Sequence, residues 1–193
     1  MPSIGHQHFE DYAPQTAAKH AILEKYFRAY VTALSRTVEA FHYVDGFAGQ
    51  GTYRDDHPGS ALLALSALAG RPNPATVTLV EADRQRFTQL EDSVRDRLAS
   101  LVEPWVVNAE FAGIAQMVWQ RPIYRQFRRV ATFAFIDPCG VSGVRLCDIG
   151  ALLRLPYGEC LIFWHYDGLN RWVGAVSAGS PSPDGLRAFF GDV

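Results

Sequence analysis

In the stretch Phe41-His42-Tyr43-Val44-Asp45-Gly46-Phe47-Ala48-Gly49-Gln50-Gly51, an apolar run ends in an acid and then breaks into three glycines. This pattern is typical of a buried strand that delivers a backbone turn to a nucleoside cofactor. Glycines tolerate positive φ and let main-chain N–H groups come close to a ligand. A glycine-x-glycine turn alone is a weak signal, because such turns often follow strands.

Two later segments repeat the pattern. Thr76–Val80 is a second β-rich run that leads into Glu81, and Thr132–Ile136 is a third that leads into Asp137-Pro138. Helical patterns separate these runs, and right-handed crossovers then place the carboxyl ends of parallel strands at one edge of a sheet. The sequence therefore predicts that Asp45, Glu81 and Asp137 share that edge.

The remaining periodicities complete an alternating α/β pattern. Strands are expected near 41–45, 76–80, 105–107, 132–136 and 159–164, and helices at 16–36, 60–70, after Asp83, within 111–129 and from 184. This order predicts a Rossmann-like three-layer sandwich with a mostly parallel sheet. We expect one domain over residues 1–193, with 1–13 as an irregular N-terminal arm. A helix beginning at 184 normally leads into a further strand, so the sheet is expected to lack its C-terminal strands.

The composition of the chain limits the classes of protein to which it can belong. With 193 residues and 48% apolar content, the chain can bury a sizeable core, and its net charge of −2 argues against a polyanion-binding surface over the whole protein. Cys139, Cys147 and Cys160 show no paired spacing, which favours a reducing cytoplasm. No signal segment and no run of membrane-spanning length are visible, so we expect a cytoplasmic protein without membrane contact.

Two polar residues follow strands two and three. Glu81 can accept both hydroxyls of a ribose. The alternative is a surface acid that caps the next helix, a role that Asp83 fills better. Asn108 can hydrogen-bond an adenine edge, and the alternative of an ordinary loop asparagine stays open.

Asp137-Pro138 is the stretch of sequence most typical of a catalytic group. Proline fixes its own φ and restricts the residue before it, so the carboxylate at the tip of a buried strand is held rigidly. Such a carboxylate can accept a hydrogen bond from an amine that is to be alkylated. The alternative is a strand-terminal turn with no chemistry.

The basic residues give weaker signals. Lysine occurs twice against sixteen arginines, and Lys19 is either a site that needs a compact ammonium or a chance occurrence. A group of arginines in 111–129 is the solvated face of a helix or, as a minority interpretation, a nucleic-acid contact. Its members are Arg121, Arg125, Arg128 and Arg129. His57 with Asp55 and Asp56 is too weak a pattern for a metal site, and none is expected.

Together the motifs resemble a class I S-adenosylmethionine-dependent methyltransferase, and more closely the three-Cys-motif partner family. Members of that family are methyltransferase-like proteins named for the cysteine-motif proteins encoded beside them. The matching pieces are residues 19–23, 43–53, 59–61, 80–83, 135–140 and 189–191. The Lys19-His20 pair and the acid-proline motif are also similar to a bacterial 23S rRNA adenine-N6 methyltransferase.

The resemblance implies methyl transfer from S-adenosylmethionine to a nitrogen. It implies that Lys19 meets the cofactor's carboxylate, that Asp137 holds the target amine, and that Pro138 and Tyr53 lie on the substrate side. The implied cofactor-binding residues are Lys19, Asp45, Gly46, Ala48, Gly49, Gly51, Glu81 and Asn108. A three-Cys-motif protein is the implied partner.

The chain departs from the family in two places. Cys139-Gly140 replaces the second proline and the aromatic residue that usually stacks on a base, and the family normally continues beyond Phe190-Gly191. A non-catalytic cofactor-binding partner and a nucleic-acid-binding module therefore stay open as alternatives. An open sheet edge is also expected to expose the apolar side chains of 161–164, with those of Phe189 and Phe190, and to favour self-association.

Overall fold

The computed structural model describes residues 12–138, 143–164, 170, 174 and 189. Five strands form one sheet in the order β3-β2-β1-β4-β5, and each neighbouring pair is parallel. The strands are β1 (Ala40–Asp45), β2 (Ala75–Val80), β3 (Trp105–Val107), β4 (Val130–Ile136) and β5 (Glu159–Ile162). The expected Rossmann-like α/β fold is confirmed by this strand order.

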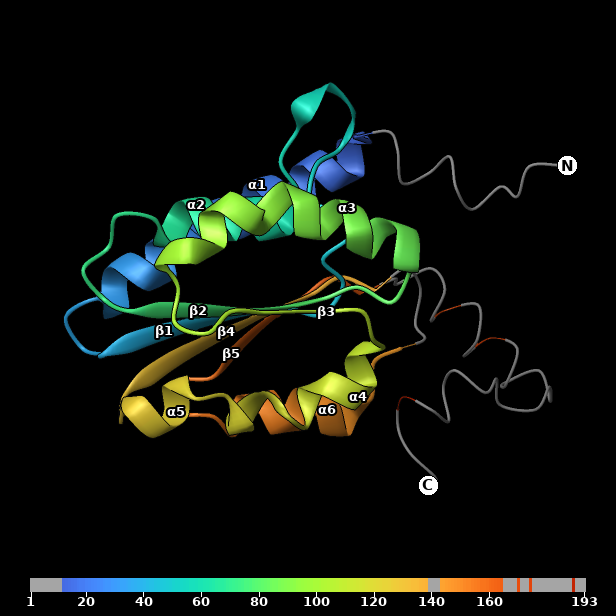
Figure 1. Cartoon of the computed structure of the whole chain (residues 1–193). Helices are drawn as coiled ribbons and strands as arrows, with labels where there is room; N and C mark the ends of the chain where they lie inside the picture. The colour runs from blue at the N-terminus through green and yellow to red at the C-terminus, as the bar shows by residue number, and fades with distance from the viewer. Residues whose placement is uncertain (1–11, 139–142, 165–169, 171–173, 175–188, 190–193) are drawn as a thin grey trace, which may run out of the picture.

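Helices cover both faces of the sheet, as Figure 1 shows. One layer holds α1 (Pro14–Leu34), α2 (Ser60–Leu68) and α3 (Arg84–Val94), and the other holds α4 (Phe111–Ala115), α5 (Ile123–Gln126) and α6 (Leu146–Leu153). Three short 3-10 turns join them: η2 (Arg54–Asp56), η3 (Arg95–Ser100) and η4 (Val118–Gln120). None of the helices in the described ranges is long and apolar enough to cross a membrane.

The core lies on both faces of the central strands. Every position of β1, β2 and β4 is buried, as near-continuous apolar runs of a covered parallel sheet require. On the α1 side the Phe27 ring lies 5.0 Å from the rings of Tyr43 and Phe133. On the opposite side Val44 and Phe111 belong to a second apolar cluster. The sheet is therefore packed on both of its faces.

A buried polar network joins three strands to α5. His42 Nδ1 lies 2.8 Å from the Tyr124 hydroxyl, and His42 Nε2 lies 2.8 Å from Thr78 Oγ1. The Tyr124 hydroxyl is also 2.8 Å from Thr132 Oγ1. Burial lowers the pKa of His42 to about 3, so the ring is neutral and serves as a donor and an acceptor between strands.

Several boundaries differ from those expected. The first helix begins at Pro14, because proline is well tolerated in a first turn. The helical segments expected within 111–129 are present as α4, η4 and α5, and Pro122, which lacks an N–H, stands where α5 begins. Apart from Phe189, the helix expected from 184 lies outside the described residues, as do most of the N-terminal arm and Cys139-Gly140.

The expected exposure of 161–164 is wrong. These side chains are half-buried because they alternate between the two cores. Leu161 and Phe163 pack on the α1 side, whereas Ile162 and Trp164 pack on the α4 side. The Trp164 ring also lies 4.5 Å from that of Phe189, which is buried and not exposed as expected. β5 itself ends at Ile162, two residues earlier than expected.

The network around His42 predicts a specific cost of removing one hydroxyl. Tyr124→Phe should lower the free energy of unfolding by about 1–3 kcal/mol, because buried partners on β1 and β4 lose their hydrogen bond. Tyr157→Phe is the matched control, since the Tyr157 ring is exposed, and should change stability by less than about 0.5 kcal/mol. Urea unfolding of both variants checks this, and equal effects would contradict a stabilising network.

Candidate nucleoside-binding site

The carboxyl ends of the central strands bring three acids to one edge. Asp45 ends β1 and pairs in register with Leu79 of β2 and Phe135 of β4. Glu81 follows β2 directly, and Asp137 follows β4. The predicted common edge is confirmed. It lies where β1 and β4 are neighbours although β2 and β3 separate them in sequence, the position at which open α/β sheets bind ligands.

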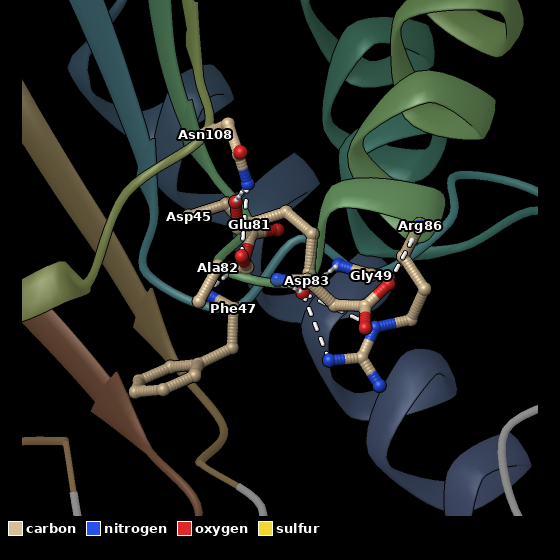
Figure 2. A network of polar contacts seen from close by, with 8 residues as sticks. All are labelled: Asp45, Phe47, Gly49, Glu81, Ala82, Asp83, Arg86 and Asn108. Atoms are coloured by element: carbon tan, nitrogen blue, oxygen red, sulfur yellow. Dashed lines mark hydrogen bonds and ion pairs between the residues drawn. The ribbon is translucent and has the colours of Figure 1, made fainter. Parts of the chain in front are cut away.

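The Glu81 carboxylate is the centre of this edge (Figure 2). Its Oε2 atom accepts the Gly49 N–H at 3.0 Å, and its Oε1 atom accepts the Asp83 N–H at 2.8 Å. Arg86 also donates to Oε1, from Nε at 3.1 Å and from Nη2 at 2.9 Å. With 5% exposure, the carboxylate joins the loop after β1, the loop after β2 and the start of α3.

The main chain of the glycine loop, residues 46–51, is hydrogen-bonded to neighbouring parts of the fold. Four consecutive N–H groups, those of residues 46–49, donate to acceptors within the fold. The acceptors are the Phe135 carbonyl for Gly46 (3.0 Å), Asp45 Oδ1 for Phe47 (3.2 Å), the Val80 carbonyl for Ala48 (2.9 Å) and Glu81 Oε2 for Gly49 (3.0 Å). These N–H groups are therefore not available as an anion-binding cradle, which needs them unpaired. The approach of this loop to a ligand stays a prediction.

The three glycines have different reasons to be glycine. A Cβ at Gly46 would lie 2.9 Å from the Phe111 ring, and one at Gly51 (φ +84°) would lie 2.7 Å from Ser93 Cβ. Gly49 (φ +64°) has nothing within 4 Å of such a Cβ. Packing thus explains Gly46 and Gly51, and Gly49 borders open space. Ala48 is buried, so its expected ligand contact is not supported either.

Asp45 supports the loop from inside the protein. Its carboxylate is fully buried and accepts the Tyr43 hydroxyl at 3.0 Å and the Phe47 N–H at 3.2 Å. The Ser60 hydroxyl, at the start of α2, also hydrogen-bonds it. Burial, with a smaller contribution from the charge of Asp137, raises the pKa of Asp45 to about 6. A direct cofactor contact by Asp45 is not supported, because its oxygens face the core.

The resemblance implies that Lys19 meets the carboxylate of the cofactor and that Asp137 holds the target amine. In the structure these two side chains form an ion pair with each other. Lys19 Nζ also lies 6.0 Å from the centre of the Phe163 ring. Pro138, expected on the substrate side, is buried. It holds the Asp137 backbone at the end of β4.

Asn108 follows β3 and holds the chain after β2. Its Nδ2 atom donates to the carbonyls of Glu81 at 2.8 Å and Ala82 at 2.9 Å. An adenine contact by Asn108 would therefore use its Oδ1 atom. The role expected from the sequence stays a prediction.

Tyr53 belongs to an aromatic cluster beside Lys19. Its ring lies 5.5 Å from Tyr12 and 5.6 Å from His20, and Tyr12 stacks on His57 at 4.4 Å. His20 is 4% exposed, and burial, helped by the Lys19 charge, lowers its pKa to about 4. The rings of Tyr12, His20, Tyr53 and His57 thus form one aromatic cluster, in which His20 adjoins Lys19 in sequence.

The arginines of 111–129 do not form one basic helical face. The Arg121 guanidinium stacks 4.9 Å over the Trp105 ring and donates to the Glu103 carbonyl at 2.7 Å. Arg129 pairs with Glu39 at 3.7 Å. These side chains hold loops together, so the nucleic-acid interpretation loses the continuous helix on which it depended.

Sequence reasoning missed Arg86. Asp83 caps α3 by accepting the Arg86 N–H at 2.9 Å, as expected for the cap itself. That cap fixes where the helix begins, and it directs the third helical residue back toward the end of β2. The sequence signal that could have identified Arg86 is its position, three residues after the acid that caps the helix.

A cavity away from this edge of the sheet is a weaker candidate for a ligand site. A cavity of about 590 Å³ lies at the opposite end of β2, between residues 68–75 and 96–102. Ligands of open α/β sheets bind at the carboxyl ends of strands, and this cavity faces an amino end. In the described ranges, no group of three or more His, Cys, Asp and Glu side chains could hold a metal ion.

Comparisons with protein-family models and with curated proteins give no match. Among solved structures, the chain is similar to protein LPL1258 from Legionella pneumophila str. Philadelphia 1, of the family model DUF519, with 12% identity and a TM-score of 0.44. The similar region covers 62% of this chain and 56% of the Legionella chain. The fold assignment rests on the strand order and parallel pairing found in this chain itself.

The raised pKa of Asp45 predicts a pH-dependent cost. The folded pKa of about 6 exceeds the ordinary value of 3.8, so stability from Asp45 is present below the lower value and lost as pH rises through 6. Relative to Asp45→Asn, the wild type should lose roughly 2–3 kcal/mol of unfolding free energy between about pH 4 and pH 7. Urea unfolding across this range measures the difference. Parallel curves, or a relative gain for the wild type, would contradict it.

Proposed function

We propose that the chain is an S-adenosylmethionine-dependent methyltransferase that acts on a nitrogen, of the three-Cys-motif partner type. The observation that carries the proposal is the Glu81 carboxylate at the end of β2, bonded to Gly49 of a loop whose N–H groups are already paired. A carboxylate at this position suits a ribose hydroxyl. Glu81 Oε1 already accepts from Asp83 and Arg86, so Oε2 is the oxygen left for it.

The pairing of those N–H groups favours a nucleoside over a dinucleotide. A dinucleotide site needs unpaired N–H groups and a helix N-terminus directly after the loop to hold a pyrophosphate. Here residues 52–58 separate the loop from α2, and they are closed by the bridge between Thr52 and Pro58. S-adenosylmethionine carries no phosphate and needs no such cradle.

Residues at the edge offer groups that suit several parts of this cofactor. The open space beside Gly49 leaves room for a ligand next to the loop. Glu81 Oε2 accepts one N–H from Gly49, and a carboxylate oxygen can accept a second hydrogen bond. Lys19 offers an ammonium for a carboxylate, and Asn108 Oδ1 offers an acceptor for an adenine amine.

The chemistry assigned to this chain is positioning and charge stabilisation. When bound, S-adenosylmethionine would supply an electrophilic methyl group on sulfur to a nitrogen lone pair. The carbon–sulfur bond electrons would stay on sulfur, giving S-adenosylhomocysteine, and the displaced N–H proton would pass to solvent. Asp137, held by buried Pro138, accepts a hydrogen bond from that N–H and stabilises the positive charge that develops on the nitrogen.

A second candidate is a cofactor-binding partner without catalysis. The ion pair between Lys19 and Asp137 favours it, since the proposed catalytic carboxylate is already matched by a cation. Methyl incorporation from labelled S-adenosylmethionine into total RNA, DNA and protein of the expression host separates the two candidates. Incorporation that Asp137→Ala abolishes supports the enzyme, and cofactor binding without incorporation supports the partner.

Glu81→Gln should weaken binding of S-adenosylhomocysteine about ten- to hundredfold, because a ribose hydroxyl loses a charged acceptor while the side chain keeps its shape. Isothermal titration calorimetry measures the affinity. Asp92→Asn is the matched control: it removes one carboxylate from an exposed pair with Arg95, and it should leave the affinity unchanged.

The same titration with NAD⁺ tests the class of cofactor. The wild type should bind S-adenosylhomocysteine and give no comparable signal with NAD⁺. Tighter binding of NAD⁺, or an affinity for S-adenosylhomocysteine that Glu81→Gln leaves intact, would overturn the proposed function.

A further inference from the structure

The ion pair between Lys19 and Asp137 joins parts of the chain that are 118 residues apart. Lys19 lies in the second turn of α1, and Asp137 follows β4. The two side chains are 28% and 18% exposed, so solvent and small molecules can reach the pair. A pair at this depth is weak enough to be exchanged for another partner.

The surroundings make Lys19 the cation that balances this edge. Asp45 lies behind Asp137 and interacts with its charge. His20, next to Lys19, is neutral because burial and the Lys19 charge lower its pKa to about 4. Arg86 is engaged with Glu81. Within the described ranges, Lys19 is the cation in ion-pair contact with Asp137.

We propose that Lys19 is exchanged between Asp137 and the carboxylate of the cofactor, so that cofactor binding uncovers Asp137 for the acceptor nitrogen. The proposal rests on the proposed function. Lys19 is then a positioning residue with two states. In one state its ammonium covers Asp137, and in the other it binds the amino-acid end of the cofactor.

Electrostatics favours moving the Lys19 ammonium from Asp137 to the carboxylate of the cofactor. Methyl transfer builds positive charge on the acceptor nitrogen, and a nearby ammonium opposes that charge while it also weakens Asp137 as an acceptor. Moving the ammonium to an incoming carboxylate removes both effects and keeps the added negative charge neutralised. The acceptor site is therefore complete only after the cofactor is bound, and binding is ordered with the cofactor first.

The exchange predicts that replacing Lys19 and replacing Asp137 change the affinity for S-adenosylhomocysteine in opposite directions. S-adenosylhomocysteine has the carboxylate, whereas 5′-methylthioadenosine has the same nucleoside and a thioether but no amino-acid group. Lys19→Met should weaken S-adenosylhomocysteine binding, because the carboxylate loses its cation. Asp137→Asn should strengthen it by roughly two- to fivefold, because the competing carboxylate is gone. Neither variant should change the affinity for 5′-methylthioadenosine.

Calorimetry with both ligands on the wild type, both variants and Asp92→Asn tests this, with thermal unfolding to check that each variant folds. A purely structural ion pair predicts that both variants weaken both ligands together. If the wild type binds both ligands but Asp137→Asn weakens S-adenosylhomocysteine or leaves the ratio of the two affinities unchanged, only the exchange is overturned. If the wild type binds neither ligand, the proposed function fails and the exchange fails with it.

Discussion

The position of β1 at the centre of an all-parallel sheet is the constraint on which the rest of the structure depends. This strand is buried along its whole length and bonded to β2 on one side and β4 on the other. Its pairing aligns the carboxyl ends of three strands, and the residues after those ends must then lie together. Asp45, Glu81 and Asp137 are neighbours for that reason, although up to 92 positions separate them along the chain (137 − 45).

Three negative charges at one edge are costly unless each has its own partners. Asp45 is satisfied by hydrogen bonds inside the core, Glu81 by two N–H groups and Arg86, and Asp137 by Lys19. Arg86 is the cation that balances Glu81, and Lys19 is the cation that balances Asp137. Under the proposed exchange, a cofactor carboxylate would take over the Lys19 ammonium from Asp137.

The sequence was sufficient for the fold, because continuous apolar strands that end in acids leave few arrangements other than a covered parallel sheet. It was also sufficient for the acids' common edge and for the Asp83 cap. It could not show that the N–H groups of residues 46–49 are paired, or that Lys19 meets Asp137, because both depend on distances between segments remote in sequence. The roles of Gly46 and Gly51 depend likewise on Phe111 and Ser93, which only folding brings near.

The central claim is that the space beside Gly49 and Glu81 holds a nucleoside. The most direct measurement is a titration of the ¹⁵N-labelled protein with S-adenosylhomocysteine, followed by the amide signals. The account predicts that the Gly49 amide shifts most, because its acceptor on Glu81 becomes shared with the ribose, and that amides of Asp83 and Arg86 shift with it. Shifts confined to residues 68–75 and 96–102, around the cavity at the other end of β2, would contradict it.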